Sequence, residues 1–267
     1  MISDPQRCSF KLDTLRCTGA DGPNCLTTGQ LGVVKLVYSG AKTKDGKTYA
    51  YGFPVGHEGG TTGWRAWIVG PNPPERRPDG TLAFTASPPT GYALAEQNLR
   101  FLAVDDDDPT FNWRTFRFDR DLPRLKTMTE ILSPADPNLR PFKSGGGKLL
   151  MYHGWADPAI SAYGTLDYYQ EVVKKVGGQG EADAFLRLYL VPGMHHCAGG
   201  PGPNTFDMLP VLEDWVERGV APGPVVATHR TDGRVDRTRP LCPHPQVARY
   251  TRNGSVDDAA SFTCQKN

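Results

Sequence analysis

Two short apolar segments late in the chain each lead into a loop that carries polar side chains. The first reads GGGKLLMYHGWADP and ends at Asp157, and the second reads LRLYLVPGMHHCAGG and contains His195 and His196. Apolar runs without polar alternation are typical of strands that are buried on both faces of a parallel sheet. Functional groups of such sheets lie in the loops at the carboxyl ends of the strands. The two loops are therefore predicted to carry a functional site.

The pattern around these segments predicts alternating strands and helices. Residues 148–153 and 185–191 are the expected strands, and apolar residues recur at helical spacing in 162–176 and again in 205–218. A strand, a helix and a second strand joined by short links indicate a right-handed βαβ unit. Such a unit places both loops at the same edge of the sheet. The fold class predicted for this part of the chain is therefore α/β.

An acidic residue followed by a histidine, each after a strand, matches the later two members of a Ser-Asp-His triad in an α/β-hydrolase. Asp157 is then the candidate acid and His196 the candidate base. An ordinary Asp-Pro turn is the alternative explanation for Asp157 at this position. In that fold the nucleophilic serine comes first, on a Gly-x-Ser-x-Gly turn, and the chain contains no such turn. Ser9 has no glycine neighbour, and the other serines considered, Ser39, Ser144 and Ser255, have glycine on one side only. No nucleophile is therefore predicted in this chain.

Metal chemistry is disfavoured by the spacing of the candidate ligands. The run His195–Cys197 consists of adjacent residues, which rarely bind one ion, and no CxxC or HxxxH pattern is present. The pair His57-Glu58 lacks the second histidine of a zincin helix. The run Asp105–Asp108 could bind a cation, but a solvated acidic turn is the favoured interpretation. His153, at the end of the first strand, is expected to be a packed, hydrogen-bonded residue rather than a base.

Composition excludes two classes of partner. The net charge of the 267 residues is +1, so no basic face for nucleic acid is implied. No apolar run approaches the ~18 residues of a membrane span, and MISDPQRCSF has no signal-peptide pattern. The 30 glycines and 24 prolines, with 10% aromatic residues, predict long ordered loops.

The first half of the chain shows short elements separated by such loops. The pattern predicts a helix from the capping box Thr27-x-x-Gln30 to Gly40, irregular structure with short strands such as 65–69 over residues 41–88, and helices at 89–104 and 122–132. Prolines 134, 137 and 141, followed by three glycines, mark a boundary near residue 145.

Six cysteines suggest a disulfide framework. Cys17 and Cys25 are eight residues apart around a turn, and Cys242 and Cys264 bracket the C-terminal tail. Disulfides belong to oxidising compartments, which conflicts with the lack of a leader sequence. Loss of an N-terminal segment would reconcile the two observations, and free buried thiols in a cytosolic protein are the alternative.

The chain resembles, nearly from end to end, the C-terminal half to two thirds of the tannase and feruloyl esterase family. The resemblance rests on DPQRCSF, RTFRFDRD, LLMYHGWADPAI, LVPGMHHCAGGPGPNTFD, DWVERGVAP and RTRPLCPHPQVARY. Members are secreted or periplasmic α/β-hydrolases that cleave esters of aromatic acids. The resemblance implies that Asp157 is the triad acid and His196 the triad base. It also implies disulfides Cys17–Cys25 and Cys242–Cys264.

Other features of the family would lie upstream of this chain. The resemblance implies that Cys8 and Cys197 pair with upstream cysteines, the latter with one beside the nucleophilic serine. It also implies a structural calcium whose ligands precede Met1, so no metal ligand is assigned here. Residues 1–145 correspond to most of a lid domain, and residues 146–267 to the C-terminal part of the catalytic domain.

The expected function is that of a serine carboxylesterase acting on small aromatic esters of gallic or hydroxycinnamic acids, inactive as the isolated chain. The intact protein would be secreted or periplasmic, with no nucleic-acid or membrane partner; the oligomeric state is left open. The alternative is a non-catalytic module of the same family that binds aromatic compounds or a partner. Complementation by a separate N-terminal chain is a third possibility.

Overall fold

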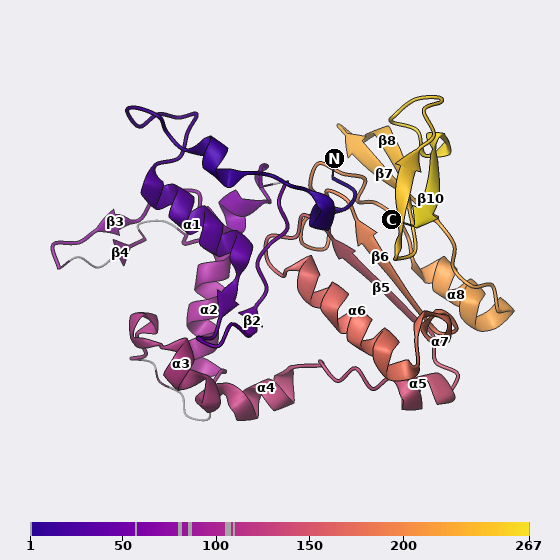
Figure 1. Ribbon diagram of the computed structural model, residues 1–267, viewed down its shortest axis with the longest axis horizontal. Helices are drawn as coiled ribbons and strands as arrows, with labels where there is room; N and C mark the ends of the chain where they lie inside the picture. The colour runs from indigo at the N-terminus through magenta and orange to yellow at the C-terminus, as the bar shows by residue number, and fades with distance from the viewer. Residues whose placement is uncertain are drawn as a thin grey trace. The chain divides into compact units, whose positions relative to one another are not determined.

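The structure is a computed structural model that describes residues 2–56, 58–79, 82–84, 87–104, 108 and 110–266 (Figure 1). The chain folds into two compact units. The first unit comprises Met1–Ser39, Gly52–His57 and Asp136–Asn267, and the second comprises Gly40–Tyr51 and Glu58–Ala135. The N-terminal 39 residues thus group with the C-terminal half, whereas the predicted division lies at residue 145. The assignment of a lid and a catalytic domain stays a prediction.

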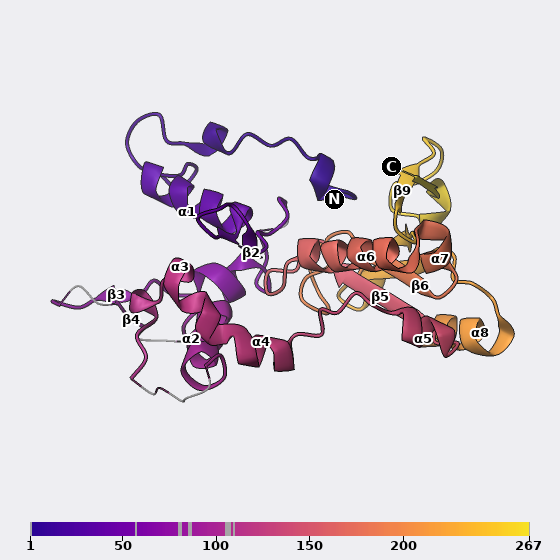
Figure 2. The same ribbon diagram turned by 60° about the horizontal axis from the view of Figure 1, so that its bottom comes forward.

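The centre of the first unit is a pair of parallel strands, β5 (Leu149–Gly154) and β6 (Leu186–Val191). Their register runs from Leu149 opposite Leu186 to Gly154 opposite Val191. Figures 1 and 2 show the two arrows side by side and pointing the same way. The connection contains α6 (Ala162–Val176) and the short α7 (Gln179–Asp183). The predicted strand–helix–strand unit is therefore confirmed.

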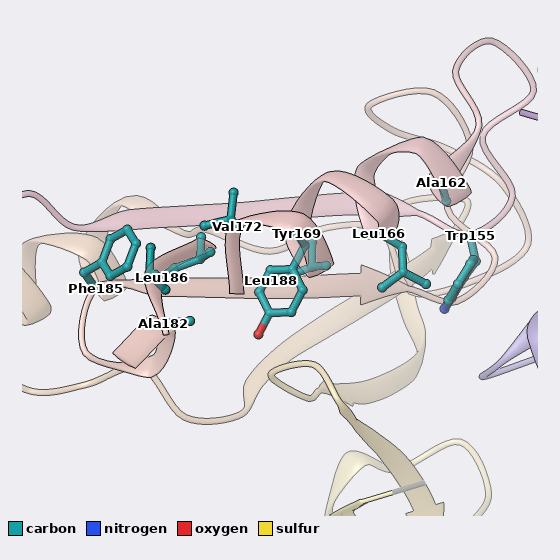
Figure 3. Close-up of a cluster of buried hydrophobic side chains, with 10 residues drawn as sticks. Trp155, Ala162, Leu166, Tyr169, Val172, Ala182, Phe185, Leu186 and Leu188 are labelled. Carbon is teal, nitrogen blue, oxygen red and sulfur yellow. The ribbon is translucent and has the colours of Figure 1, made fainter. Parts of the chain in front are cut away.

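Helix α6 has clear signals at both ends and one buried face. The Ser161 hydroxyl accepts a hydrogen bond from the Tyr163 amide at the N-terminus, and Gly177 ends the helix in the left-handed conformation with φ 110°. Its inner face packs on β6 in a core whose members are Trp155, Ala162, Leu166, Tyr169, Val172, Val176, Ala182, Phe185, Leu186 and Leu188 (Figure 3). Each large side chain buried there contributes roughly 1.5–3 kcal/mol.

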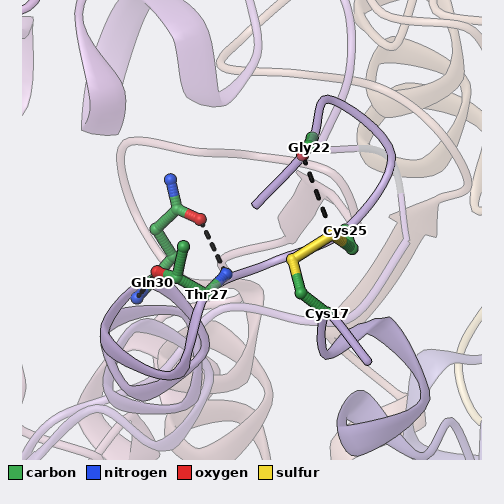
Figure 4. The surroundings of a disulfide bond; sticks show 5 residues. All are labelled: Cys17, Gly22, Cys25, Thr27 and Gln30. Carbon is green, nitrogen blue, oxygen red and sulfur yellow. Dashed lines mark hydrogen bonds between the residues drawn. A yellow bond between two sulfur atoms is a disulfide. The ribbon is translucent and has the colours of Figure 1, made fainter. Parts of the chain in front are cut away.

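Helices α1 (Thr28–Ser39), α5 (Arg140–Ser144) and α8 (Leu209–Arg218) belong to the same unit. The predicted capping box exists: the Thr27 amide donates to Gln30 Oε1 at 2.9 Å, and the Gln30 amide donates to Thr27 Oγ1 at 3.2 Å (Figure 4). The Cys17–Cys25 disulfide lies beside this cap.

The helix predicted over 205–218 begins later than expected, at Leu209. The Leu209 amide donates to the Asp207 carboxylate, and Thr205 exchanges backbone hydrogen bonds with Thr228 instead of entering the helix. Pro210 in the first turn suits a helix start because its position needs no amide hydrogen.

The C-terminal part forms two antiparallel strand pairs that the sequence patterns did not reveal. The first is β7 (Val225–Thr231) with β8 (Arg234–Leu241), and the second is β9 (Gln246–Tyr250) with β10 (Phe262–Lys266). The Asp232-Gly233 turn, with φ 50° and 79°, gives the two left-handed residues that a tight hairpin requires. The Cys242–Cys264 disulfide links the end of β8 to β10.

The second unit consists of short elements between loops. They are β1 (Ala41–Lys42), β2 (Thr48–Ala50), β3 (Glu75–Arg76), β4 (Leu82–Ala83), α2 (Thr90–Phe101), α3 (Phe118–Asp121) and α4 (Lys126–Leu132). Helix α2 is shorter than the predicted 89–104. The predicted helix at 122–132 is a 3-10 turn, Leu122–Leu125, followed by α4.

The strand predicted at residues 65–69 is wrong, because Arg65–Val69 is a π-helix. The turn that starts it needs a glycine at position 63: a Cβ there would lie 2.4 Å from the Gly59 carbonyl oxygen. The amides of Ala66 and Trp67 both donate to the Gly63 carbonyl, which winds the chain into a helical turn. A five-residue apolar run fits a strand or a buried helical turn equally well, so periodicity could not separate them.

Candidate active site

The loops that follow β5 and β6 are joined to each other by backbone hydrogen bonds. The Trp155 amide donates to the Val191 carbonyl at 2.9 Å, and the Ala156 amide donates to the Met194 carbonyl at 3.1 Å. The Asp157 amide turns back to the Gly154 carbonyl at 3.2 Å. These bonds continue the strand pairing past the ends of the strands and place Asp157 next to the loop that contains His195 and His196.

Glycine at two positions allows the loops to approach this closely. A Cβ on Gly154 would lie 2.2 Å from the Met194 carbonyl oxygen and 2.8 Å from that of His195. A Cβ on Gly200 would lie 2.2 Å from the Gly193 carbonyl oxygen, and its φ of 93° also favours glycine. Both contacts are with backbone, which cannot rotate away, so neither position accepts a side chain without displacing the loop.

Asp157 is the most heavily bonded side chain of the site. Its carboxylate is buried, with 5% of the side chain exposed. One oxygen, Oδ1, accepts from the amides of Ala159 and Ile160 at 2.8 and 2.9 Å. The other, Oδ2, lies 2.9 Å from Nδ1 of His196 and 3.4 Å from Nε2 of His153.

The pKa of Asp157 reflects two opposing effects. Burial, the largest single effect, raises the pKa because it penalises the charged form. The hydrogen bonds from His153, the Ile160 amide, His196 and the Ala159 amide together outweigh burial and lower the pKa to about 2. The carboxylate is therefore ionised at neutral pH and ready to accept from an imidazole N–H.

His196 and His195 have different environments despite being adjacent. The His196 side chain is 34% exposed and bonds Asp157 through Nδ1, whereas His195 is buried, with 1% exposed. Because a carboxylate only accepts, Nδ1 of His196 carries the proton, and in the neutral ring the lone pair is then on Nε2. This is the tautomer that a general base needs. The structure thus brings Asp157 and His196 together as the sequence predicts; their catalytic roles stay a prediction.

Three of the four candidate serines form local hydrogen bonds. Ser39 Oγ donates to the Leu36 carbonyl, Ser144 Oγ donates to the Arg140 carbonyl, and Ser255 Oγ accepts from the Asp257 amide. Ser9 lies on an exposed segment without regular secondary structure. None of the four serines lies on the strand-to-helix turn that carries the nucleophile in this fold.

The cysteines form two disulfides and leave two thiols. Cys17 is bonded to Cys25, and Cys242 to Cys264, while Cys8 and Cys197 are free and exposed. Cys197 has a φ of 63°, which is unusual for a residue other than glycine.

No group of three side chains suited to a metal ion occurs in the part of the chain that the structure describes. His57 and Asp105–Asp107 of the two weaker metal candidates lie outside the described residues. No helix among those described is long and apolar enough to cross a membrane.

His153 is hydrogen-bonded, as the sequence predicts, but its contact with the candidate acid was not foreseen. Its Nδ1 lies 2.7 Å from Oγ1 of Thr165, and its Nε2 lies 3.0 Å from the Ile160 carbonyl oxygen. Thr165 lies on α6, and no sequence pattern singles it out. The available signal was the four-residue spacing of His153 and Asp157 across a turn.

Comparison with known proteins places the chain in a family. Residues 1–265 match the family described as "Tannase and feruloyl esterase". The chain is 35% identical to mono(2-hydroxyethyl) terephthalate hydrolase of Piscinibacter sakaiensis, over 94% of this chain and 43% of that protein. It is 27% identical to feruloyl esterase B of Aspergillus niger, over 99% of this chain and 50% of that protein.

Solved structures show the same fold. An esterase from Aspergillus oryzae superposes with a TM-score of 0.80 at 24% identity, covering 99% of this chain and 52% of the other. Feruloyl esterase B from the same organism gives a TM-score of 0.77. The predicted α/β-hydrolase fold is confirmed. The chain spans about half the length of the relatives it matches. By the match across residues 1–265, the chain belongs to the tannase and feruloyl esterase family.

Proposed function

We propose that Asp157 and His196 are the acid and base of a Ser-His-Asp triad in a carboxylic ester hydrolase that acts on esters of aromatic acids. The observation that carries this proposal is the 2.9 Å contact between Asp157 Oδ2 and His196 Nδ1, at the ends of adjacent parallel strands in a chain of an esterase family. The serine would lie outside these 267 residues, because no Gly-x-Ser-x-Gly turn occurs within them.

The chemistry follows from the tautomer of His196. Nε2 takes the proton from the serine hydroxyl as its oxygen attacks the ester carbonyl, and Asp157 stabilises the imidazolium that forms. Collapse of the tetrahedral intermediate breaks the ester C–O bond, and the imidazolium gives its proton to the leaving alcohol. Water then attacks the acyl-enzyme by the same route, releasing the aromatic acid and restoring the serine.

The names of the relatives support an aromatic acyl group as the substrate. Feruloyl esterase B and mono(2-hydroxyethyl) terephthalate hydrolase are each named for an ester of an aromatic acid. The two disulfides support a secreted or periplasmic location, since such bonds persist in oxidising compartments.

An ester hydrolysis assay tests the location of the nucleophile. The purified chain should hydrolyse methyl ferulate no faster than buffer, since loss of the nucleophile costs on the order of 10⁶-fold in rate. Turnover by the purified chain that disappears in His196→Ala would overturn this part of the proposal.

The catalytic roles need a protein that carries the serine. The DNA upstream of Met1 should encode, in frame, a Gly-Cys-Ser-x-Gly-Gly stretch, and the extended protein should hydrolyse methyl ferulate. In that protein, His196→Ala and Asp157→Asn should lower kcat by several orders of magnitude. An extended protein that keeps full activity in His196→Ala would contradict the assignment, and one that binds ferulate without turnover would favour the non-catalytic alternative.

A further inference from the structure

His153 is held at both ring nitrogens between the strand β5 and the helix α6. Only 12% of its side chain is exposed. Nδ1 lies 2.7 Å from Oγ1 of Thr165, and Nε2 lies 3.0 Å from the Ile160 carbonyl oxygen. A carbonyl oxygen only accepts, so Nε2 carries a proton in either protonation state of the ring. The ring therefore has one orientation, and its Nε2–H points toward the Asp157 loop.

The same N–H also lies near the candidate acid. Nε2 of His153 is 3.4 Å from Oδ2 of Asp157, the oxygen that lies 2.9 Å from Nδ1 of His196. The two histidines thus share one carboxylate oxygen, while backbone amides occupy the other. A carboxylate oxygen has two lone-pair directions. The two imidazole groups can therefore both lie against this oxygen, His196 at 2.9 Å and His153 at 3.4 Å.

We propose that His153 is a positioning residue that fixes the Asp157 carboxylate toward His196, and that Thr165 fixes the ring of His153 in turn. This inference rests on the proposed function, in which Asp157 orients the base. Its physical basis is independent of turnover: the Nε2–H of His153, held by the Ile160 carbonyl, lies 3.4 Å from Oδ2 and places partial positive charge beside the oxygen that His196 contacts. The contact with His153 also favours the ionised carboxylate, and it is one of the causes of the lowered pKa of Asp157.

The test is a pH titration of Asp157 in the chain itself. The protein is labelled with ¹³C-aspartate, and the NMR signal of the Asp157 carboxyl carbon is monitored as the pH changes. Asp157→Asn identifies the resonance. In His153→Phe, which keeps a ring but removes the donor, the midpoint should rise by about one pH unit. His153→Gln, which restores an N–H donor, should bring the midpoint part of the way back. His229→Phe, which removes a histidine bonded to Asp236 on the β7–β8 hairpin, should leave it unchanged.

Thr165→Val removes the hydroxyl with little change of shape and should shift the midpoint in the same direction by a smaller amount. It also decides the question if His153→Phe does not fold. An Asp157 midpoint that stays at the wild-type value in every folded His153 and Thr165 variant would overturn the proposal. The titration needs no nucleophile, so it tests the positioning role of His153 even if the esterase proposal fails. An unchanged Asp157 midpoint would in turn leave the result of the esterase assay unaffected.

Discussion

The Nδ1 atom of His196 lies 2.9 Å from Oδ2 of Asp157, although 39 residues separate the two in the chain. The parallel pairing of β5 with β6 produces this contact, because it aligns Gly154 with Val191 and starts both loops at the same edge. The Ala156–Met194 hydrogen bond then holds the loops together beyond the sheet. The pair thus depends on backbone geometry as much as on the two side chains.

Acid should destabilise the protein partly through Asp157. Its pKa is about 2 in the folded chain, against the ordinary value of 3.8 expected for an unfolded one, so the folded state binds fewer protons between these values. The resulting contribution, roughly 2 kcal/mol, is present above about pH 4 and is lost as the pH falls toward 2. Urea unfolding at a series of pH values measures it.

Asp157→Asn should reduce the dependence of the unfolding free energy on pH between about 4 and 2, since an amide does not titrate in this range. Asp232→Asn is the matched control, because this exposed residue has a φ of 50°, which asparagine adopts readily. The control should retain the wild-type slope. If Asp157→Asn leaves the pH dependence of the unfolding free energy unchanged, the loss of stability in acid has another origin.

Gly154→Ala should disrupt the candidate site without touching a catalytic side chain. The new Cβ would lie 2.2 Å from the Met194 carbonyl oxygen, so the two loops must move apart. We expect a loss of roughly 2–4 kcal/mol in unfolding free energy. Gly180→Ala, in α7 with nothing within 4 Å of the new Cβ, should be neutral or stabilising by up to about 1 kcal/mol. Equal stabilities of the two variants would contradict the close approach of the two loops.

The sequence was sufficient to predict α6 because its apolar pattern is long, and the two flanking strands because each is an apolar run joined to that helix by a short link. Residues 162–176 repeat apolar side chains at helical spacing and end in two glycines, and the structure places the helix at these residues. The parallel sheet then determined that Asp157 and His196 would lie at one edge. Their 2.9 Å contact follows from topology, which periodicity can reveal.

Other features depend on contacts that no local pattern encodes. Arg65–Val69 is helical because Gly63 allows a close backbone approach, which five apolar residues do not specify. The role of His153 depends on the Ile160 carbonyl and the Thr165 hydroxyl, which meet it only after α6 packs on the sheet. Late strands such as β9 and β10 are short and half exposed, so their alternation is weak.

Thiol chemistry should distinguish the four bonded cysteines from the two free ones. Ellman's reagent should label Cys8 and Cys197 in the folded, unreduced chain, and all six cysteines after reduction and unfolding. More than two reactive thiols before reduction would contradict the two disulfides.

Replacing the pair Cys242 and Cys264, which are 22 residues apart, by serine should lower the free energy of unfolding by about 3 kcal/mol, as measured by urea unfolding. The Cys17 and Cys25 pair, which closes a shorter loop, should cost slightly less.

The core beneath α6 should contribute strongly to the stability of the first unit. Leu188 is 0% exposed on β6, so Leu188→Ala removes buried apolar surface and leaves a cavity between the strand and the helix. The expected cost is about 2–5 kcal/mol. Leu209→Ala makes the same chemical change at a residue that is 62% exposed, and it should alter stability by no more than about 0.5 kcal/mol. Urea unfolding of both variants compares the two sites directly. If the two substitutions cost the same, the side chain of Leu188 would not be packed in the α6–β6 core, and the strand that leads to His196 would need another source of stability.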